Sequence, residues 1–328
     1  MRHFQEGTRV HLFANPLSGH GATRKCLPSI INALAGRGMK VTTHLFSCPE
    51  DLEQVGSDAV DADLWLVAGG DGSTEAVASR LASLDDQIPL GLLPTGSVNN
   101  TVQAFSLPSD WRQALKALLQ GKPAPVDLID VGGKTCLSCA SFGFDAAACH
   151  YLETHHGVKN LSDGRERMAV FLYFMVGIKT FITYAPSRMR VVSADPEKRR
   201  SGYWVLLGNF PHYPGPWKLF PHADPHDGLF DILVCHRSGF LDTLRYVVVS
   251  KHGHHIRQSD ITYFQAKELV IRAEGGGKVP FQIAGHQVGN LADSSLRIKV
   301  KPKALRIMVP EHYPSPLSGE PSHGPSST

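Results

Sequence analysis

The chain has 328 residues, 33 Lys and Arg against 30 Asp and Glu, and a formal net charge of +3. That length suits two domains, and 42% hydrophobic with 19% charged residues is typical of a folded protein. The small charge argues against the broad basic face that nucleic-acid binding needs, so no nucleic-acid partner is expected.

The six cysteines are too few for a disulfide scaffold and suit a reducing compartment. Cys136 and Cys139 have CxxC spacing but lack further ligands at zinc spacing, which favours buried thiols. The N-terminus lacks a signal-peptide pattern, and the apolar run at 168–178 is about half the length that spans a bilayer. We therefore expect a cytoplasmic protein.

Short β-type runs alternate with helical patterns through the first 130 residues. The predicted strands are 9–16, 40–47, 63–70 and 89–96, and the predicted helices are 22–38, 49–59, 74–84 and 110–121. This alternation predicts an α/β domain with a parallel sheet, in which ligands bind beyond the carboxyl ends of the strands.

The remaining chain has mostly β-type patterns separated by Pro and Gly turns. The predicted strands at 201–210, 228–237, 266–274, 278–285 and 295–302 are typical of an antiparallel β-sandwich. We predict an α/β domain at 1–129 completed by a returning segment at 300–311, a β-rich domain at 130–299 and a disordered tail at 312–328. The active site is expected in the cleft between the two domains.

Three polar loops follow predicted strands, at 15–19, 69–74 and 94–100. Glycine lets the backbone turn sharply and approach a ligand, and amides at a helix start bind phosphate oxygens. The loops lack both the P-loop and the dinucleotide-binding patterns, so a different phosphate-binding scheme is required. Asp71 stands between glycines, where it either caps a helix, steers a metal or removes a proton from an acceptor hydroxyl.

The sequences NPLSG, GGDGS and PTGSVNN resemble the loop motifs of the diacylglycerol kinase catalytic family, which includes sphingosine, ceramide and bacterial lipid kinases. The segments VDLIDV, SFGFDA, HADPHDGLFDILV and GHHI keep the order of that family up to about residue 311. The resemblance implies a nucleotide-binding N-terminal domain and a C-terminal domain that holds a lipid. It also implies a role in lipid metabolism and phospholipid biosynthesis, with ATP and Mg²⁺ as cofactors.

The same resemblance implies which residues form the site. ATP would be bound by Asn15, Ser18, Gly19, Ser47, Gly69, Gly70, Asp71, Gly72, Ser73, Thr74, Thr95, Gly96, Ser97 and Asn99. A structural Mg²⁺ would lie on Asp227 with help from Asp224 and Leu229, although this segment is equally an Asx-type turn.

The chain departs from the family at three carboxylates. Ala284-Gly285-His286 replaces the DGE triplet, and Asn100 replaces an aspartate. Position 76, where the family has a glutamate, is Ala76, and Glu75 stands one place earlier. We predict that His286 supplies the base, together with Asp71, because imidazole transfers protons near neutral pH. The alternatives are a catalytically silent lipid- or nucleotide-binding protein and an NAD kinase-like enzyme.

A wide apolar helix at 167–184 is expected to line an acyl pocket or touch a membrane surface, so we expect peripheral contact with the inner membrane. A solvated turn is expected around His252, His254 and His255. The acceptor lipid and the oligomeric state stay open, with a homodimer among the alternatives.

Overall fold

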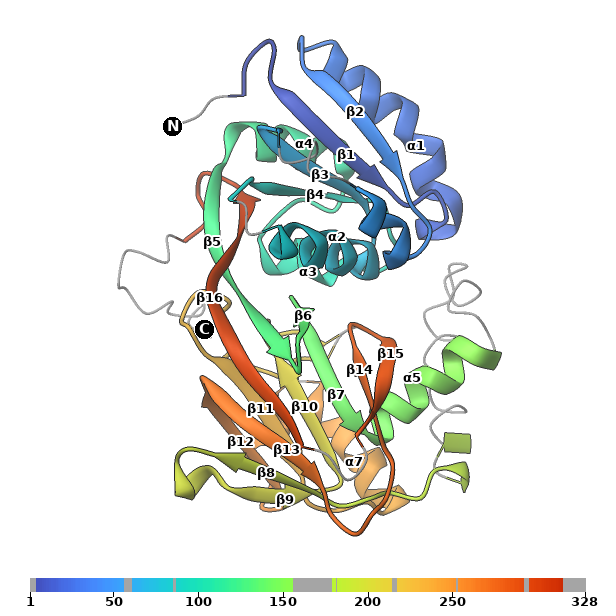
Figure 1. Cartoon of the computed structure of the whole chain (residues 1–328), viewed down its shortest axis with the longest axis vertical. Coiled ribbons are helices and arrows are strands. Elements are labelled where there is room, and N and C mark those ends of the chain that lie inside the picture. The colour runs from blue at the N-terminus through green and yellow to red at the C-terminus, as the bar shows by residue number, and fades with distance from the viewer. Residues whose placement is uncertain are drawn as a thin grey trace, which may run out of the picture.

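The structure is a computed structural model that describes residues 4–55, 61–84, 87–155, 179–180, 182–213, 217–251, 253–291 and 295–314. It has two lobes, one carrying α1 to α4 and the other α5 and α7 (Figure 1). Two long strands, β5 (Lys122–Val131) and β16 (Ser295–Val309), run through both lobes.

The N-terminal lobe contains the predicted parallel strands. Its strands lie in the order β2 (Lys40–Leu45), β1 (Arg9–Ala14), β3 (Leu64–Gly69) and β4 (Leu90–Pro94), and its helices are α1 (Ser18–Ala35), α2 (Asp71–Ser83), α3 (Asn100–Ala104) and α4 (Trp111–Gln120). The pairs β1–β2, β1–β3 and β3–β4 are all parallel. Because the carboxyl ends of adjacent parallel strands share one edge, the loops after β1, β3 and β4 are brought together there.

The predicted α-helix at 49–59 is wrong over its described part. Residues Pro49–Gln54 form a 3-10 helix, η1, after which Val55 returns to extended backbone. The carboxylate of Asp51 accepts the backbone N–H groups of Ser47 and Cys48 at 2.7 and 3.2 Å, which stabilises a tight turn at this point.

The sheet of the N-terminal lobe continues into the other lobe. Ile307 of β16 pairs in parallel with Leu90 of β4, while β16 and β5 pair antiparallel along nearly all of β5. Beyond β16 follow β13 (Glu268–Ala273), β8 (Met189–Ser193) and β9 (Arg200–Gly202), and β6 (Lys134–Cys136) pairs with β5. The expected parallel sheet is therefore one part of a mixed ten-stranded sheet.

A second, antiparallel sheet lies in the C-terminal lobe. Its order is β12 (Ile261–Ala266), β11 (Phe230–Cys235), β10 (Trp204–Gly208), β7 (Cys139–Gly143), β14 (Val279–Ile283) and β15 (His286–Leu291). Buried side chains of both sheets share one core, for example Ile129, Phe142, Val191 and Ile298. The predicted two-lobed architecture is confirmed. The lobe also contains α5 (Phe144–His155), α7 (Phe240–Ser250), η4 (Pro196–Lys198) and η5 (His254–Arg257).

Two side chains are buried, one from the turn predicted to be solvated and one from the tail predicted to be disordered. His255 has no exposed surface, and its Nε2 lies 2.9 Å from the carbonyl oxygen of Leu219, so a solvated turn is wrong for this residue. Tyr313 packs in the N-terminal core, with its hydroxyl 3.0 Å from His226 Nε2. The tail boundary predicted at 312 is therefore too early.

The apolar helix predicted at 167–184 falls largely outside the described residues, which resume at 179, and His252 also lies outside them. Within the described part of the chain, no helix is long and apolar enough to cross a membrane.

Candidate active site

The predicted phosphate loops meet at the carboxyl edge of β1, β3 and β4. The hydroxyl oxygens of Ser18 and Ser73, from the first and second loops, are 3.1 Å apart. The second and third loops touch through glycines, since a Cβ on Gly96 would lie 2.3 Å from the Cα of Gly70. Such a distance is closer than real contacts allow, so this approach of two backbones requires glycine.

The first loop also lies against the third. Gly19, His20 and Gly21 have left-handed φ angles of 58°, 54° and 80°, which bend the chain before the regular part of α1. A Cβ on Gly19 would lie 2.2 Å from the carbonyl oxygen of Thr95. The hydroxyl of Thr95 is 2.6 Å from that of Thr23, so this buried side chain holds α1 against the third loop.

The two asparagines predicted to bind ATP shape their own loops. Asn15 Oδ1 accepts the N–H of Leu17 at 3.0 Å. Asn99 has a left-handed φ of 55°, and its side chain exchanges two hydrogen bonds with the backbone of Gly96, at 3.1 and 2.8 Å. Ser97, which lies between Gly96 and Asn99 in this loop, is exposed.

The N-terminus of α2 opens at this meeting point without a side-chain cap. Its N-cap residue is Gly70, and the first bond of the helix runs from the N–H of Thr74 to the Gly70 carbonyl at 3.0 Å. The amides of a first helical turn have no acceptor within the helix. Such amides and the positive end of the helix dipole bind anions, so this terminus fits a phosphate group.

Asp71 caps α3 instead of its own helix. Its Oδ1 accepts the N–H and the hydroxyl of Thr101 at 2.8 and 2.9 Å, and its Oδ2 accepts the N–H of Asn100 at 3.0 Å. A carboxylate offers about four lone pairs, so roughly one remains for another partner. With Asn100 and His286 in place of carboxylates, this rim does not fit a Mg²⁺ ion held by several protein carboxylates.

His286 begins β15 and faces the same helix end from the other lobe. Its Nε2 lies 3.0 Å from the position that a Cβ on Gly72 would occupy, and its side chain is exposed. The pKa of Glu50 is lowered mainly by its own backbone amide and the Cys48 thiol, with a smaller contribution from His286. The exposed turn from Ser47 to Glu50 therefore borders His286 as well. The structure thus gathers Asp71 and His286 at one helix terminus.

Glu75 bonds the turn between β6 and β7. Its carboxylate accepts the backbone N–H of Leu137, and the N–H and hydroxyl of Ser138 at 3.1 and 2.8 Å. Burial raises the pKa of Glu75 to about 7 despite these bonds. Cys136 and Cys139, on either side of this turn, are buried free thiols, as predicted. The displaced carboxylate therefore ties α2 to the turn between β6 and β7.

A polar network that the sequence analysis did not predict lies in the C-terminal lobe. Asp145 Oδ2 accepts the hydroxyls of Ser141 and Tyr213, each at 2.5 Å, and Gln282 Nε2 donates to Ser141 Oγ at 2.9 Å. Gln282 Oε1 in turn accepts the N–H of Gly285, the residue before His286, at 2.5 Å. Burial raises the pKa of Asp145 although these hydrogen bonds oppose the shift.

The network also reaches the third loop. Asn100 Nδ2 donates to the carbonyl oxygen of Tyr213 at 3.5 Å, and Tyr213 bonds Asp145 through its hydroxyl. The network thus connects the start of α3, which Asp71 caps, with the turn that precedes His286. The motif SFGFDA contains Asp145 and gave a signal for it, whereas Tyr213 and Gln282 carry no motif of their own.

Asp224 and Asp227 lie in the exposed turn before β11. Asp227 Oδ1 accepts the N–H of Leu229 at 2.8 Å. Desolvation, followed by the negative charges of Asp224 and Asp127, raises the pKa of Asp227. Carboxylate oxygens such as these are the kind of ligand that a hard cation prefers. Over the described ranges there is no cluster of three or more His, Cys, Asp and Glu side chains placed for a metal, so such an ion would rely on backbone oxygens.

Comparisons with known proteins agree with this arrangement. Residues 9–131 match the family model described as the diacylglycerol kinase catalytic domain, and residues 139–309 match the YegS C-terminal NAD kinase beta sandwich-like domain. A diacylglycerol kinase of Bacillus subtilis is 24% identical over 83% of this chain and 91% of its own length. One of Staphylococcus carnosus is 22% identical over 89% and 92%.

Among solved structures, a diacylglycerol kinase of Bacillus anthracis has 18% identity and a TM-score of 0.69, and the match covers 95% of this chain and all of that one. At this identity the structural likeness concerns the fold. Because the two family models together extend from residue 9 to residue 309, the chain belongs to the diacylglycerol kinase catalytic family with a YegS-type C-terminal domain.

Proposed function

We propose that this protein is an ATP-dependent lipid kinase. The observation that carries the proposal is the uncapped N-terminus of α2, where three glycine-bearing loops converge and His286 approaches from the other lobe. The amides of this terminus and the hydroxyls of Ser18 and Ser97 would bind the phosphates of ATP. Asp224, Asp227 and the carbonyl of Leu229 would hold Mg²⁺ away from the reacting atoms.

In this proposal the acceptor hydroxyl lies beside His286, next to the terminus of α2. The hydroxyl oxygen forms a bond to the γ-phosphorus, and the bond from that phosphorus to the bridging oxygen of ADP breaks. His286 takes the proton that the hydroxyl loses. Asp71 fixes the start of α3 and thereby the third loop. The chain would act chiefly by positioning and by stabilising charge, as phosphoryl transfer requires.

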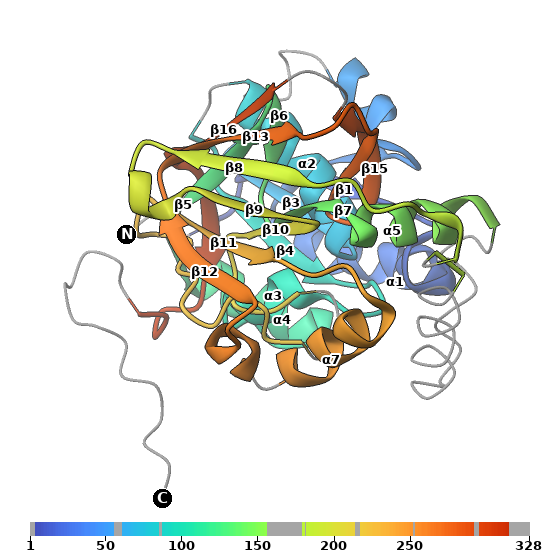
Figure 2. The ribbon, with the colours of Figure 1, turned by 90° about the horizontal axis from the view of Figure 1, so that it is seen from below.

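An exposed apolar stripe on α7 supports a lipid acceptor presented from a membrane. Leu241, Leu244 and Val248 are 76%, 36% and 65% exposed, and their spacing of three and four residues places them along one face of the helix. Figures 1 and 2 place α7 in the C-terminal lobe, at the end of the molecule away from α1. Large apolar side chains exposed in a row are typical of an interfacial helix.

The charges around this helix fit an anionic bilayer. Lys251 follows α7 directly, and Lys218 and Arg257 are also exposed. Lys218 lies close to the segment after α7, because its carbonyl oxygen is 3.7 Å from the position that a Cβ on Gly253 would occupy. Each basic side chain near an anionic surface adds about 1 kcal/mol of attraction. We therefore propose that this stripe contacts a bilayer surface, and that the protein acts as a peripheral protein at the inner face of the cytoplasmic membrane.

Transfer of label from γ-labelled ATP to lipid tests the proposal. Purified protein is incubated with Mg²⁺, labelled ATP and vesicles that contain diacylglycerol, ceramide, sphingosine or a total lipid extract. Labelled phospholipid that depends on the protein is the expected result. Absence of label in every lipid, with ATP binding intact, would instead select a protein that binds nucleotide without turnover.

That second function is favoured by two observations. Three donors already occupy the carboxylate of Asp71, and a histidine stands where the family has its acid. A silent member of the family would keep the phosphate-binding loops while losing the proton acceptor. Nucleotide binding measured by calorimetry, beside the label transfer, separates the two functions.

A further inference from the structure

The hairpin turn before His286 has a strained backbone. Ala284 and Gly285 alone join β14 to β15, since Ile283 pairs with His286. Both turn residues have positive φ angles, 50° and 88°, as a type I′ turn requires. Glycine adopts such an angle freely, whereas alanine has a Cβ that clashes there and lacks the polar side chain with which Asn and Asp tolerate it. The sequence of this turn therefore does not by itself favour the observed conformation.

Two hydrogen bonds hold the turn in this conformation. The N–H of Ala284 donates to the carbonyl oxygen of Cys139 at 2.9 Å. The N–H of Gly285 donates to Oε1 of Gln282 at 2.5 Å. The first acceptor belongs to the backbone of the neighbouring strand β7, so any side chain at that position would leave it in place. The second acceptor is a side chain, and the turn therefore depends on the identity of residue 282.

The neighbours of Gln282 impose the orientation in which its oxygen faces the turn. This side chain is fully buried. Its Nε2 lies 2.9 Å from Ser141 Oγ, 3.1 Å from the Tyr213 hydroxyl and 3.4 Å from Asp145 Oδ2. The hydroxyls of Ser141 and Tyr213 both donate to Asp145, which leaves their lone pairs to accept from Gln282. An amide nitrogen only donates, so these acceptors hold it and leave Oε1 for Gly285.

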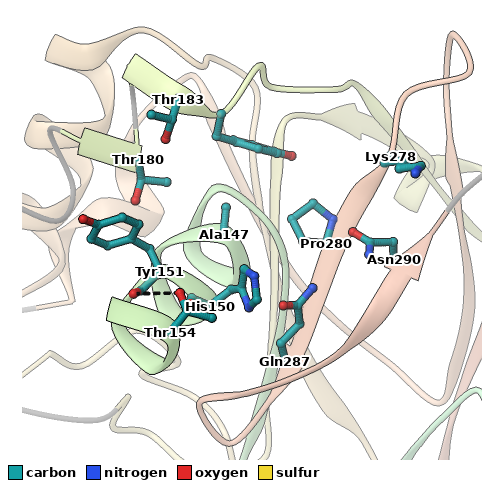
Figure 3. Close-up of a pocket in the computed structure, with 11 residues that line it drawn as sticks. Ala147, His150, Tyr151, Thr154, Thr180, Thr183, Lys278, Pro280, Gln287 and Asn290 are labelled. Carbon is teal, nitrogen blue, oxygen red and sulfur yellow. Dashed lines mark hydrogen bonds between the residues drawn. The ribbon is translucent and has the colours of Figure 1, made fainter. Parts of the chain in front are cut away.

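Packing against α5 does not replace these bonds along the rest of the hairpin. A pocket of about 410 Å³ lies between the hairpin and α5, with Gln287 and Asn290 of β15 and Tyr151 of α5 among its lining residues (Figure 3). Gln287 follows His286 directly. Side chains that border a pocket make fewer close contacts than side chains in a core, so they restrain a strand less. Near the turn, hydrogen bonds therefore carry much of the restraint on β15.

We propose that Gln282 is a positioning residue for the transfer reaction, because it holds the Ala284-Gly285 turn and thereby keeps His286 beside the N-terminus of α2. Asp145 and Tyr213 act through Gln282 by fixing its orientation. This inference rests on the proposed kinase function, in which His286 takes the proton. The phosphate-binding amides belong to the other lobe, so loss of Gln282 should lower kcat while KM for ATP stays unchanged.

Label transfer into lipid tests this role. Gln282→Met keeps the length of the side chain and removes its amide, so kcat should fall about tenfold or more, as expected for a misplaced reacting group. Ala284→Asn gives the turn the Asn-Gly pair that type I′ turns favour. Added to Gln282→Met, it should restore kcat severalfold. Unchanged kcat in Gln282→Met, or a loss that Ala284→Asn does not restore, overturns the inference.

A milder pair of variants applies if Gln282→Met does not fold. Tyr213→Phe removes one acceptor of Gln282 and should lower kcat about threefold. The matched control is Tyr246→Phe, which removes another hydroxyl bonded to a carboxylate of the same lobe, that of Asp260 at 2.9 Å. Equal kcat values in these two variants would count against any role of the network in positioning.

Hydrogen exchange measured by mass spectrometry follows the turn without turnover. The amides at 285–288 should exchange at least about tenfold faster in Gln282→Met, and those at 286–288 should slow again when Ala284→Asn is added. Faster exchange with unchanged kcat overturns this inference and leaves the kinase proposal standing. The expected exchange pattern, with no lipid labelled by the wild type, supports the hold of Gln282 on the turn and overturns the kinase proposal.

Discussion

The carboxylate of Asp71 and the backbone N–H of Thr101 are 2.8 Å apart, and this bond joins the start of α2 to the helix that follows the loop after β4. The hydroxyl of Thr101 donates to the same oxygen at 2.9 Å. The residue expected to serve the chemistry therefore also fixes the geometry of two loops.

We expect Asp71→Asn to lower both activity and stability. An amide accepts fewer hydrogen bonds, so α3 loses part of its cap, at about 1 kcal/mol of unfolding free energy. If Asp71 also steers the reacting groups, kcat falls at least about 100-fold. Urea unfolding and label transfer measure the two effects. Thr101→Val removes the hydroxyl bond alone and serves as the control for the structural part; full activity of Asp71→Asn would exclude Asp71 from the mechanism.

His286→Ala should reduce kcat about 100-fold or more with little effect on KM for ATP, because loss of a general base affects the transition state. His286→Glu, which restores the carboxylate of the family motif, should retain activity and shift the acidic limb of the pH–rate profile to lower pH. The exposed His254 gives the control His254→Ala. A His286→Ala enzyme with an unchanged pH–rate profile would contradict the proposed role.

Gly96→Ala should separate the second and third loops. The new methyl group would lie 2.3 Å from the Cα of Gly70, and a backbone neighbour cannot move aside cheaply. We expect ATP affinity to fall at least about tenfold, measured by calorimetry. Gly36→Ala is the control, since this glycine caps α1 with a φ of −64°. Wild-type affinity in Gly96→Ala would show that close loop contact is not needed for nucleotide binding.

Glu75 predicts a pH dependence of stability. Its pKa is raised from 4.5 to about 7 in the folded state, so the native protein binds the proton more tightly than the unfolded chain. As far as Glu75 is concerned, the free energy of unfolding should therefore be highest below pH 4.5. It should fall by about 3 kcal/mol as the pH rises to about 7. Urea unfolding across this range, compared with Glu75→Gln, checks it. A slope that persists unchanged in Glu75→Gln would assign the effect to other groups.

The apolar stripe on α7 predicts membrane binding. Leu241→Asp and Val248→Asp should each reduce cosedimentation with anionic vesicles severalfold, because a carboxylate is repelled by the surface and resists burial. Leu45, which is 61% exposed on β2, gives the matched control Leu45→Asp. Equal loss of binding in the control, or none in the α7 variants, would place the contact elsewhere.

The sequence by itself determined the two-lobed fold and the place of the loops. Apolar runs such as 64–69 alternate with helical patterns, and parallel strands necessarily end at one edge. The glycines at 70 and 96 were recognisable as sites of close backbone approach, because glycine alone permits it.

Only the tertiary structure decided which way the polar side chains point. Glu75 faces Leu137 and Ser138, Asp71 caps a helix that begins 29 residues later, and Gln282 bonds Ser141 across 141 positions. Local patterns do not encode such partners, because a hydrogen bond depends on distances set by the packing of both sheets. The acidic or histidine residues of a motif can be read from the sequence, but their roles follow from the neighbours that folding provides.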